Sequence, residues 1–322
     1  MRTIALEEHF WTDELASPPG TGPLERPDGA RLDEQLRDLG GDRIAGMDAA
    51  GIDMQVLSHV PAAAQGLTGA AAAQAAGRAN DLLAAAIAAH PDRLAGFATL
   101  PTGDPAAAVR ELNRSVTSLG LVGAMIHSTI GTNGAFLDDE RFQPVLAAFE
   151  ELDVPLYLHP APPPPDVEGV LFGGLKPAVA ARLATNAWGW HAETGLHALR
   201  LVAAGTFERH PRLRLIIGHC GEMLPFMLAR VDQVLPPALT GLPHPVSTYV
   251  HRNIWVTTSG MFSLPPVLCS IAVMGIERVL FSVDYPFAAN AHGRQMLDAL
   301  PVSPADKARI AGQNAAALLR LP

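Results

Sequence analysis

Four residues at the ends of short apolar runs carry side chains that bind divalent metal ions. Glu7 and His9 follow the first apolar run. In a β-strand, side chains two residues apart point to the same side, so these two project together where the strand ends. His159 and Asp284 lie at the ends of two later runs. Two imidazoles and two carboxylates form a donor set that suits Zn or Mn and leaves room for water or substrate.

A second pair of titratable side chains lies at the end of another apolar run. His219 is followed three residues later by Glu222, about one turn on if a helix begins there. A carboxylate beside an imidazole fixes its tautomer and raises its basicity. We therefore expect a pair that handles a proton or orients a substrate. The alternative is an acidic residue at a helix start beside a buried histidine.

The lysine content bears on the number of metal ions. Many barrels that hold two metal ions bridge them with a modified lysine. The lysines of this chain are Lys176 and Lys307, and neither ends an apolar run. We therefore expect one divalent ion.

The composition excludes several classes of function. The chain has 322 residues, 48% of them hydrophobic, and a formal net charge of -9 with no basic stripe, which argues against nucleic-acid binding. The alanine-rich residues 69–89 are interrupted by polar side chains and predict an amphipathic helix instead of a membrane span. Two cysteines do not make a disulfide framework, and no secretory signal precedes the first run, so we expect a cytoplasmic protein.

Eight apolar runs alternate with helical patterns along the chain. This alternation favours an α/β fold in which residues 1–322 form one domain, a (β/α)8 barrel. An open doubly wound sheet is the alternative, but no glycine-rich fingerprint follows the first run. A barrel gathers the carboxyl ends of all strands at one mouth, which would bring the candidate ligands together. The expected strands are residues 3–6, 54–58, 95–100, 120–126, 155–159, 213–219, 254–258 and 279–283.

Two proline-rich segments, residues 11–29 and 160–177, directly follow strands that end in candidate ligands. In a barrel these segments are loops at the catalytic face, where rigid backbone suits the wall or lid of a pocket. The alternative is a solvated linker between domains, but no change in composition marks a second domain.

Three residues are weaker candidates for a substrate pocket. His127 follows the fourth expected strand. Trp188 lies in an aromatic segment that ends at His191, where it could line a pocket for an aromatic substrate or pack in the core. Arg230 lies eight residues beyond Glu222 on the same expected helix. It could contact an anion or a phenol oxygen, or form a surface ion pair.

Longer motifs add a family resemblance. The chain resembles the amidohydrolase-2 group of the amidohydrolase superfamily, and within it the nonoxidative aromatic decarboxylases, such as those of γ-resorcylate and 2,3-dihydroxybenzoate. The chain carries Glu-x-His at the first strand in place of His-x-His, and in this it resembles the decarboxylase branch of the group. The motifs include ALEEHF at residues 5–10, DVPLYLHP at 153–160, GHCGE at 218–222 and FSVDYPF at 281–287.

The resemblance implies a distorted (β/α)8 barrel, and the residues themselves predict one divalent ion in it, Zn or Mn. The metal ligands that it implies are Glu7, His9, His159 and Asp284. The catalytic residues that it implies are Asp284 as the acid, with His219 and Glu222 as the supporting pair. Family members are usually dimers or tetramers, so a homodimer or homotetramer is expected.

The resemblance also implies substrate-pocket positions, at Phe287 and Arg230. Two departures bear on the substrate. His127 stands where relatives commonly carry Asn, and Ala288 stands where relatives often have Glu. The metal core matches the pattern of the family, so these departures affect the choice of substrate more than the class of reaction.

The expected activity is nonoxidative decarboxylation of a small hydroxylated aromatic carboxylic acid. The same residues could instead activate water for hydrolysis of a lactone, ester or amide. A binding or structural protein is the third class, and it is disfavoured because convergent titratable groups are costly to keep without a ligand.

Overall fold

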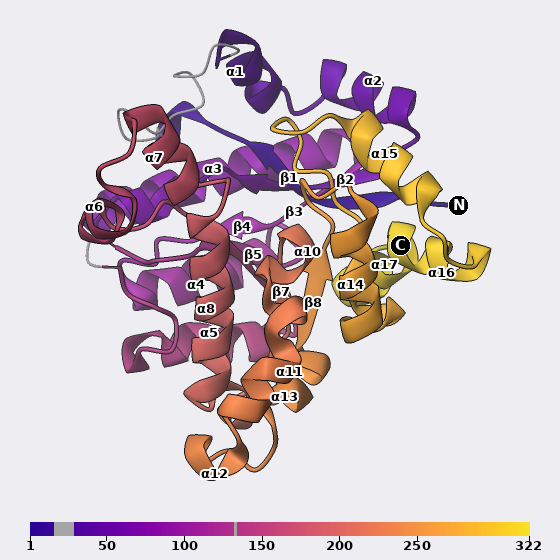
Figure 1. The fold of residues 1–322 in the computed structure, drawn as a ribbon. Helices are drawn as coiled ribbons and strands as arrows, with labels where there is room; N and C mark the ends of the chain where they lie inside the picture. The colour runs from indigo at the N-terminus through magenta and orange to yellow at the C-terminus, as the bar shows by residue number, and fades with distance from the viewer. Residues whose placement is uncertain (16–28, 132–133) are drawn as a thin grey trace.

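The computed structural model describes residues 1–15, 29–131 and 134–322, and parallel β-strands occupy its centre (Figure 1). A strand lies at each of the eight expected places, although the third is divided into two short pieces. The strands are β1 (Ile4–Phe10), β2 (Met54–His59), β3 (Leu94–Gly96), β4 (Ala98–Thr99), β5 (Ala124–His127), β6 (Leu156–His159), β7 (Leu215–Ile217), β8 (Ile254–Thr257) and β9 (Val279–Leu280).

Two parallel sheets make up the barrel, one with the order β1-β2-β3 and one running from β4 to β9 in sequence order. One seam lies at Phe97, whose N–H donates to the carbonyl oxygen of Leu57 at 2.8 Å. At the other seam, the N–H of Leu6 donates to the carbonyl oxygen of Phe281 at 3.2 Å. Leu6 also forms a parallel bridge with Ser282. The first strand therefore meets the last, and the fold is the predicted distorted (β/α)8 barrel.

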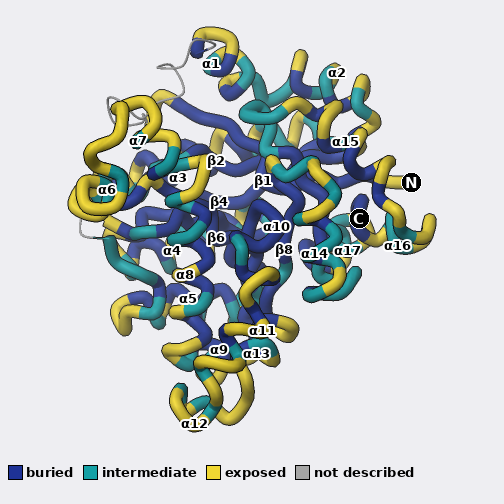
Figure 2. The backbone as a smooth tube through the Cα atoms, viewed as in Figure 1, coloured by how far each residue is buried: buried dark blue, intermediate teal, exposed yellow. Residues whose placement is uncertain are grey.

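The strand residues are buried on both sides of the barrel wall, as is typical of parallel strands covered by helices. Ile4 and Val56 pack in the interior of the barrel, whereas Ala5 and Leu57 pack outward in the larger core that includes the helices. Figure 2 shows the strands as buried backbone at the centre of the molecule. Burial on both sides explains why the strands are continuous apolar runs in the sequence.

Helices cover the outside of the barrel. The alanine-rich helix α3 buries one alanine-lined face, as its amphipathic pattern predicts, and among the described residues no helix is long and apolar enough to cross a membrane. The α-helices are α1 (Gly29–Arg37), α2 (Gly41–Ala50), α3 (Gly69–Ala89), α4 (Pro105–Thr117), α5 (Gln143–Leu152), α6 (Pro165–Phe172), α7 (Pro177–Ala184), α8 (Gly189–Ala203), α9 (Thr206–Arg209), α10 (His219–Glu222), α11 (Leu224–Val234), α12 (Pro237–Thr240), α13 (Val246–Asn253), α14 (Leu264–Met274), α15 (Asn290–Ala299), α16 (Pro304–Ala308) and α17 (Asn314–Leu319). Shorter turns are the 3-10 helices η1 (Asp13–Leu15), η3 (Ala63–Gly66), η4 (Glu140–Phe142) and η5 (Ile276–Arg278), and the π-helix η6 (Arg309–Gln313).

The two proline-rich segments differ in how much of them can be described. In the segment at residues 160–177, Pro165 begins α6 and Pro177 begins α7, at a helix position where the missing N–H costs nothing. This segment borders the large cavity described below, so it is a pocket wall with helical structure of its own. Of the segment at residues 11–29, residues 16–28 lie outside the described residues.

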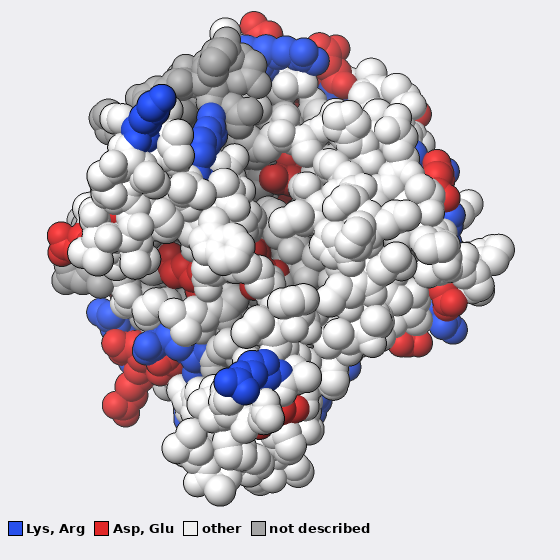
Figure 3. All heavy atoms as spheres, viewed as in Figure 1, with Lys and Arg blue, Asp and Glu red and all other residues white. Residues whose placement is uncertain are grey.

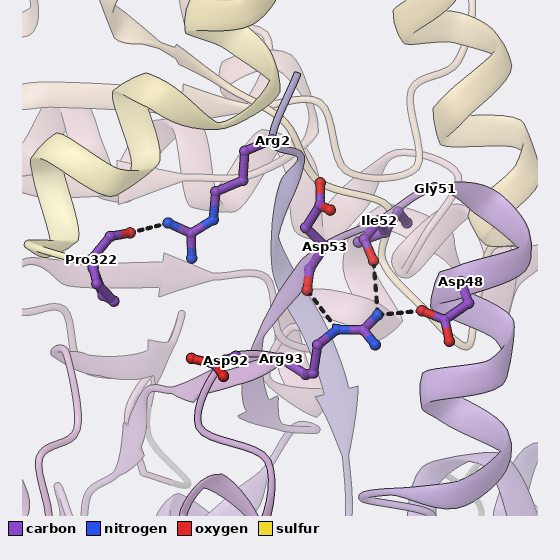
Figure 4. A pocket seen from close by; sticks show the side chains of 8 residues that line it. All are labelled: Arg2, Asp48, Gly51, Ile52, Asp53, Asp92, Arg93 and Pro322. Atoms are coloured by element: carbon purple, nitrogen blue, oxygen red, sulfur yellow. Dashed lines mark hydrogen bonds and ion pairs between the residues drawn. The ribbon is translucent and has the colours of Figure 1, made fainter.

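A shallow polar pocket lies at the opposite end of the barrel, where β1 and β2 begin (Figure 4). Its Arg93 guanidinium lies 2.6 Å from Asp48 Oδ1 and donates to the carbonyl oxygens of Asp53 at 2.8 Å and Ile52 at 3.3 Å. Arg2 donates to the carbonyl oxygen of Pro322, so the two ends of the chain meet here. In this fold the amino-terminal end of the barrel serves stability, and chemistry takes place at the other end.

The substitution Arg93→Ala should lower stability without changing catalysis. The variant loses one partly exposed ion pair and two hydrogen bonds, together about 1–3 kcal/mol. We expect a lower midpoint of urea denaturation and an unchanged kcat, because the side chain lies at the far end of the barrel from the cavity. A lower kcat with an unchanged midpoint would contradict this division between the two ends.

Candidate metal centre and active site

A bulge in β1 places Glu7 inside the barrel. The register of β1 against β2 shifts between Ala5 and Glu8, and Glu7 within the bulge has a φ of 58°. The bulge turns Glu7 to the same side as Leu6, whereas strict alternation would send these neighbours to opposite faces. His9 then follows two residues later at the mouth of the barrel. The two side chains project together, but through an irregularity that alternation does not predict.

The carboxylate of Glu7 is fully buried, and its two oxygens have different surroundings. Oε2 accepts hydrogen bonds from three hydroxyl groups, those of Tyr157, Thr257 and Ser259. Oε1 has no hydrogen-bond partner among the described residues. It lies 3.3 Å from His159 Nε2 and 3.6 Å from His219 Nε2. A buried carboxylate oxygen that faces imidazole nitrogens without a hydrogen bond fits a site for a cation.

Contacts at Nδ1 orient two of the imidazoles. His9 Nδ1 lies 3.3 Å from the hydroxyl of Ser58. His159 Nδ1 lies 2.6 Å from the carbonyl oxygen of Pro160, to which it donates. The opposite nitrogens face the site, and His9 Nε2 lies 3.3 Å from Asp284 Oδ1. Hydrogen bonds of this kind on the outer ring nitrogen are usual for histidines that bind metal ions.

Asp284 follows β9 with a φ of 74°, and its side chain is one-fifth exposed to the cavity. The residues on either side of Asp284 are held by the buried carboxylate of Glu8. This carboxylate accepts hydrogen bonds from the backbone N–H groups of Val283 at 2.8 Å and Tyr285 at 3.0 Å. Burial raises the pKa of Glu8 to about 8, although these two hydrogen bonds oppose the shift. Glu8 thus fixes the strained segment that presents Asp284.

His219, Glu222 and His191 form a buried chain of hydrogen bonds. Glu222 Oε1 lies 2.7 Å from His219 Nδ1, and Glu222 Oε2 lies 2.7 Å from His191 Nδ1. The backbone has positive φ at His219, Cys220 and Glu222, so it folds back instead of continuing as a helix. Burial lowers the pKa of His219, but the Glu222 and Glu7 carboxylates outweigh it and raise the pKa to about 10.

The charges of the site suit a cation. Burial raises the pKa of Glu7, but the imidazoles of His219, His159 and His9 outweigh it and hold the pKa below its usual range. Burial also lowers the pKa values of His159 and His127. An ionised carboxylate and neutral imidazoles are the forms that bind metal ions. Glu7, His9 and His159 bring ligand atoms close enough to share one ion.

Of the side chains described above, His9, His159, His191, His219 and Asp284 line a cavity of about 1310 Å³ at the carboxyl ends of the strands. Figure 3 shows a hollow near the centre of this face, with acidic side chains inside it. His127, one of the weaker sequence candidates, lines the cavity, and so does Phe287, a position that the family resemblance implied. The Phe287 ring meets the His9 ring edge to face at 5.6 Å between centroids. The cavity therefore combines a polar floor with an aromatic wall.

The structure places two of the sequence-predicted pocket residues, Trp188 and Arg230, outside the lining of the cavity. Trp188 precedes α8, is 57% exposed and does not line the cavity, whereas Trp190 does. Arg230 is exposed on α11, where it donates to Gln233 Oε1 at 3.0 Å. Met223 has a φ of 65° and ends α10 after one turn. Glu222 and Arg230 therefore do not share a continuous helix, which removes the argument from helix spacing.

Sequence reasoning missed several residues that shape the site. Tyr157 lies two residues before His159, so the period of the strand places both on one side, but a tyrosine inside an apolar run predicts core packing. The contact between His191 and Glu222 could not be predicted from the sequence, because the two residues lie 31 positions apart. Gly218 is needed for close approach, since a Cβ there would lie 2.7 Å from Glu7 Oε2.

Comparisons with known proteins agree with this geometry. The chain is 40% identical over 295 residues to Decarboxylase orsB of Emericella nidulans, covering 90% of this chain and 87% of that protein. It is 38% identical over 336 residues to the gamma-resorcylate decarboxylase of Rhodococcus jostii, covering 99% and 98%. A dihydroxybenzoic acid decarboxylase from Polaromonas, solved with manganese and the inhibitor 2-nitroresorcinol, is similar with a TM-score of 0.91 and 36% identity, covering 99% and 97%.

A solved 2,6-dihydroxybenzoate decarboxylase in complex with 2,6-dihydroxybenzoate matches the full length of both chains, with a TM-score of 0.89 and 36% identity. A family model described as Amidohydrolase matches residues 7–321. The match therefore spans nearly the whole barrel and includes every candidate ligand. The chain belongs to the amidohydrolase family.

Proposed function

We propose that this protein is a metal-dependent, nonoxidative decarboxylase of a hydroxylated aromatic carboxylic acid. The observation that carries the proposal is the buried Oε1 of Glu7, which has no hydrogen-bond partner in the described part of the chain and shares its surroundings with His9, His159 and Asp284. The cavity above these groups admits an aromatic ring. The decarboxylases that the chain resembles supply the reaction class.

We propose that one divalent ion, Zn or Mn, is held by Glu7, His9, His159 and Asp284. When bound, the ion supplies positive charge that orients the carboxylate and an adjacent phenolate oxygen of the substrate. The mixed nitrogen and oxygen donor set suits either metal. The Polaromonas relative contains manganese, which favours this ion.

Asp284 is the proton donor in this proposal. Direct loss of carbon dioxide from an aromatic ring would leave an aryl carbanion of very high energy. Asp284, protonated by the substrate or by water, instead gives its proton to the ring carbon that bears the carboxylate, and the ring becomes dienone-like. The bond between that carbon and the carboxylate then breaks, its electron pair restores the aromatic ring, and carbon dioxide leaves.

His219 handles the hydroxyl group of the substrate. Its Nδ1 is fixed by Glu222 Oε1 at 2.7 Å, which leaves Nε2 directed toward the metal-binding side chains, 3.6 Å from Glu7 Oε1. The Glu7 carboxylate is one of the two that raise the pKa of His219, and a bound cation would balance its charge. With that charge balanced, a neutral Nε2 could polarise or accept the proton of a hydroxyl group ortho or para to the reacting carbon. Electron density from that oxygen makes the ring carbon easier to protonate.

The wall of the cavity fits an anionic aromatic ring. Phe287, Met261 and Trp190 provide apolar surface, and Arg141 and Arg182 also line the cavity. The two arginines are exposed, so their charge draws a carboxylate toward the entrance more than it holds one. This arrangement supports a small aromatic carboxylate as the substrate.

Hydrolysis of a lactone, ester or amide would use the same side chains, with water as the nucleophile. The comparisons favour decarboxylation, because the orsB, gamma-resorcylate and dihydroxybenzoate relatives are all decarboxylases. Metal-dependent release of carbon dioxide separates the two activities directly.

Removal of the metal should abolish activity reversibly. Protein treated with a chelator should release no carbon dioxide from 2,6-dihydroxybenzoate or a related hydroxybenzoate, and added Mn²⁺ or Zn²⁺ should restore release. Glu7→Gln should lower the metal content, because the amide carries no charge to balance a cation. The exposed Glu151→Gln is the matched control and should retain its metal. Full activity in metal-depleted protein would refute the proposal, and turnover of esters or lactones without gas would favour hydrolysis.

Asp284→Asn should lower kcat by roughly 10²–10⁴-fold, the range for loss of a general acid. The amide keeps the size of the side chain but has no acidic proton to give. Asp92→Asn, an exposed change at the other end of the barrel, should leave kcat unaltered. Metal content measured on the same samples separates loss of the proton donor from loss of a ligand. An Asp284→Asn enzyme with normal kcat would rule out the assigned role.

We also propose that the protein is a homodimer or homotetramer that acts in the cytoplasm, where Cys220 and Cys269 stay reduced. Large apolar side chains are exposed on neighbouring helices, and such patches mark interfaces. They are Val170 and Leu171 on α6, Val179 on α7, Leu196 on α8, and Phe226 and Met227 on α11.

Sedimentation equilibrium should therefore give two or four times the chain mass of 33.9 kDa. Phe226→Glu, at the most exposed of the apolar positions on α11, should lower the mass, because burying the new charge is costly. The matched control Glu208→Gln changes an acidic residue on α9 and should have no effect. A monomer at all concentrations would contradict the proposal.

A further inference from the structure

His191 lies in the wall of the cavity and takes no part in the mechanism described above. It belongs to the first turn of α8 and is 8% exposed. Its Nδ1 lies 2.7 Å from Glu222 Oε2, on the side of the carboxylate opposite His219. The His191 and His219 rings are 4.5 Å apart between centroids. One buried carboxylate is therefore shared by two imidazoles.

The neighbour of His191 indicates which of its nitrogens carries the proton. The indole N–H of Trp190 donates to His191 Nε2 at 3.0 Å, and an indole N–H is always a donor. His191 Nε2 therefore uses its lone pair, and the neutral ring carries its proton on Nδ1, where it donates to Glu222. The carbonyl oxygen of Asn186 lies 3.1 Å from the same Nε2 and would accept a hydrogen bond from a ring that carries hydrogens on both nitrogens. Both ring nitrogens of His191 thus have partners.

We propose that His191 is a positioning residue for His219 and acts through Glu222. The inference rests on the proposed decarboxylase function, and it assigns the chain Trp190–His191–Glu222–His219 as the support of the group that handles the substrate hydroxyl. His191 does not need to contact the substrate for this role.

The physical basis is the freedom of a glutamate carboxylate. Rotation about the last bond of glutamate is broad, so a single hydrogen bond from His219 does not fix the plane of the Glu222 carboxylate. The second N–H, from His191, fixes both oxygens and satisfies Oε2, which is buried. The Glu222 Oε1 lone pair then faces His219 Nδ1, and His219 Nε2 stays directed into the site. Loss of His191 would leave Oε2 without its donor and free the carboxylate to turn.

Two substitutions of similar size separate this role from packing. His191→Leu removes the donor, whereas His191→Asn places an amide N–H near the position of Nδ1. We expect His191→Leu to lower kcat by about 10–100-fold, the usual effect of removing such a supporting partner, with KM and metal content little changed. His191→Asn should recover most of the loss. Equal activity in the two variants, whether high or low, would overturn the proposal.

A spectroscopic readout tests the same inference without relying on turnover. In Zn²⁺-loaded protein, proton NMR should show far-downfield signals from the two imidazole N–H groups that donate to Glu222, assigned by their loss in His219→Gln and His191→Leu. His191→Leu should also shift the His219 signal, and His191→Asn should return it toward its original position. A His219 signal that does not move in His191→Leu would overturn the proposal even if kcat fell.

The two readouts distinguish the inference from the proposed function. If the wild-type protein releases no carbon dioxide from hydroxybenzoates but the His219 signal shifts as expected, the decarboxylase function fails and the coupling through Glu222 stands. If carbon dioxide is released and neither kcat nor the signal responds to His191→Leu, the function stands and the positioning role is wrong.

Discussion

Glu7 carries its charge at the base of the barrel mouth, where solvent does not reach it. An ionised carboxylate in such a place costs several kcal/mol unless other charges and hydrogen bonds compensate for it. Three hydroxyls satisfy Oε2, but Oε1 has imidazole nitrogens around it and no hydrogen bond within the described ranges. A divalent cation among these groups would balance the negative charge of the Glu7 carboxylate. The other candidate ligands, His9, His159 and Asp284, lie around the place that this cation would occupy.

The backbone that presents these groups is strained where the chemistry would take place. Glu7, His219 and Asp284 all have positive φ, a conformation that costs about 1–3 kcal/mol at a residue with a side chain. Each is held by its surroundings. Glu7 lies in a bulge, and His219 lies in the fold-back that pairs it with Glu222. The residues on either side of Asp284 donate their backbone N–H groups to the Glu8 carboxylate. The barrel keeps its interior apolar and still turns polar side chains into the mouth.

The sequence predicted the strands well because parallel strands buried on both faces are continuous apolar runs, and each run of this chain ends close to where its strand does. The candidate ligands followed, since a barrel brings strand ends to one mouth. Nothing in the sequence predicts the bulge at Glu7, whose neighbours are Leu6 and Glu8. The exposed positions of Trp188 and Arg230 depend on where α8 and α11 begin, which apolar periodicity does not resolve. The pairing of His191 with Glu222 depends on tertiary structure alone.

A crystal structure of the protein with Mn²⁺, with the ion located by its anomalous scattering, tests the central claim most directly. We expect one strong peak per chain within coordination distance of Glu7 Oε1, of Nε2 of both His9 and His159, and of the Asp284 carboxylate. A peak at the other cluster with suitable ligands, formed by His191, His219 and Glu222, would contradict it, as would no ion near Glu7.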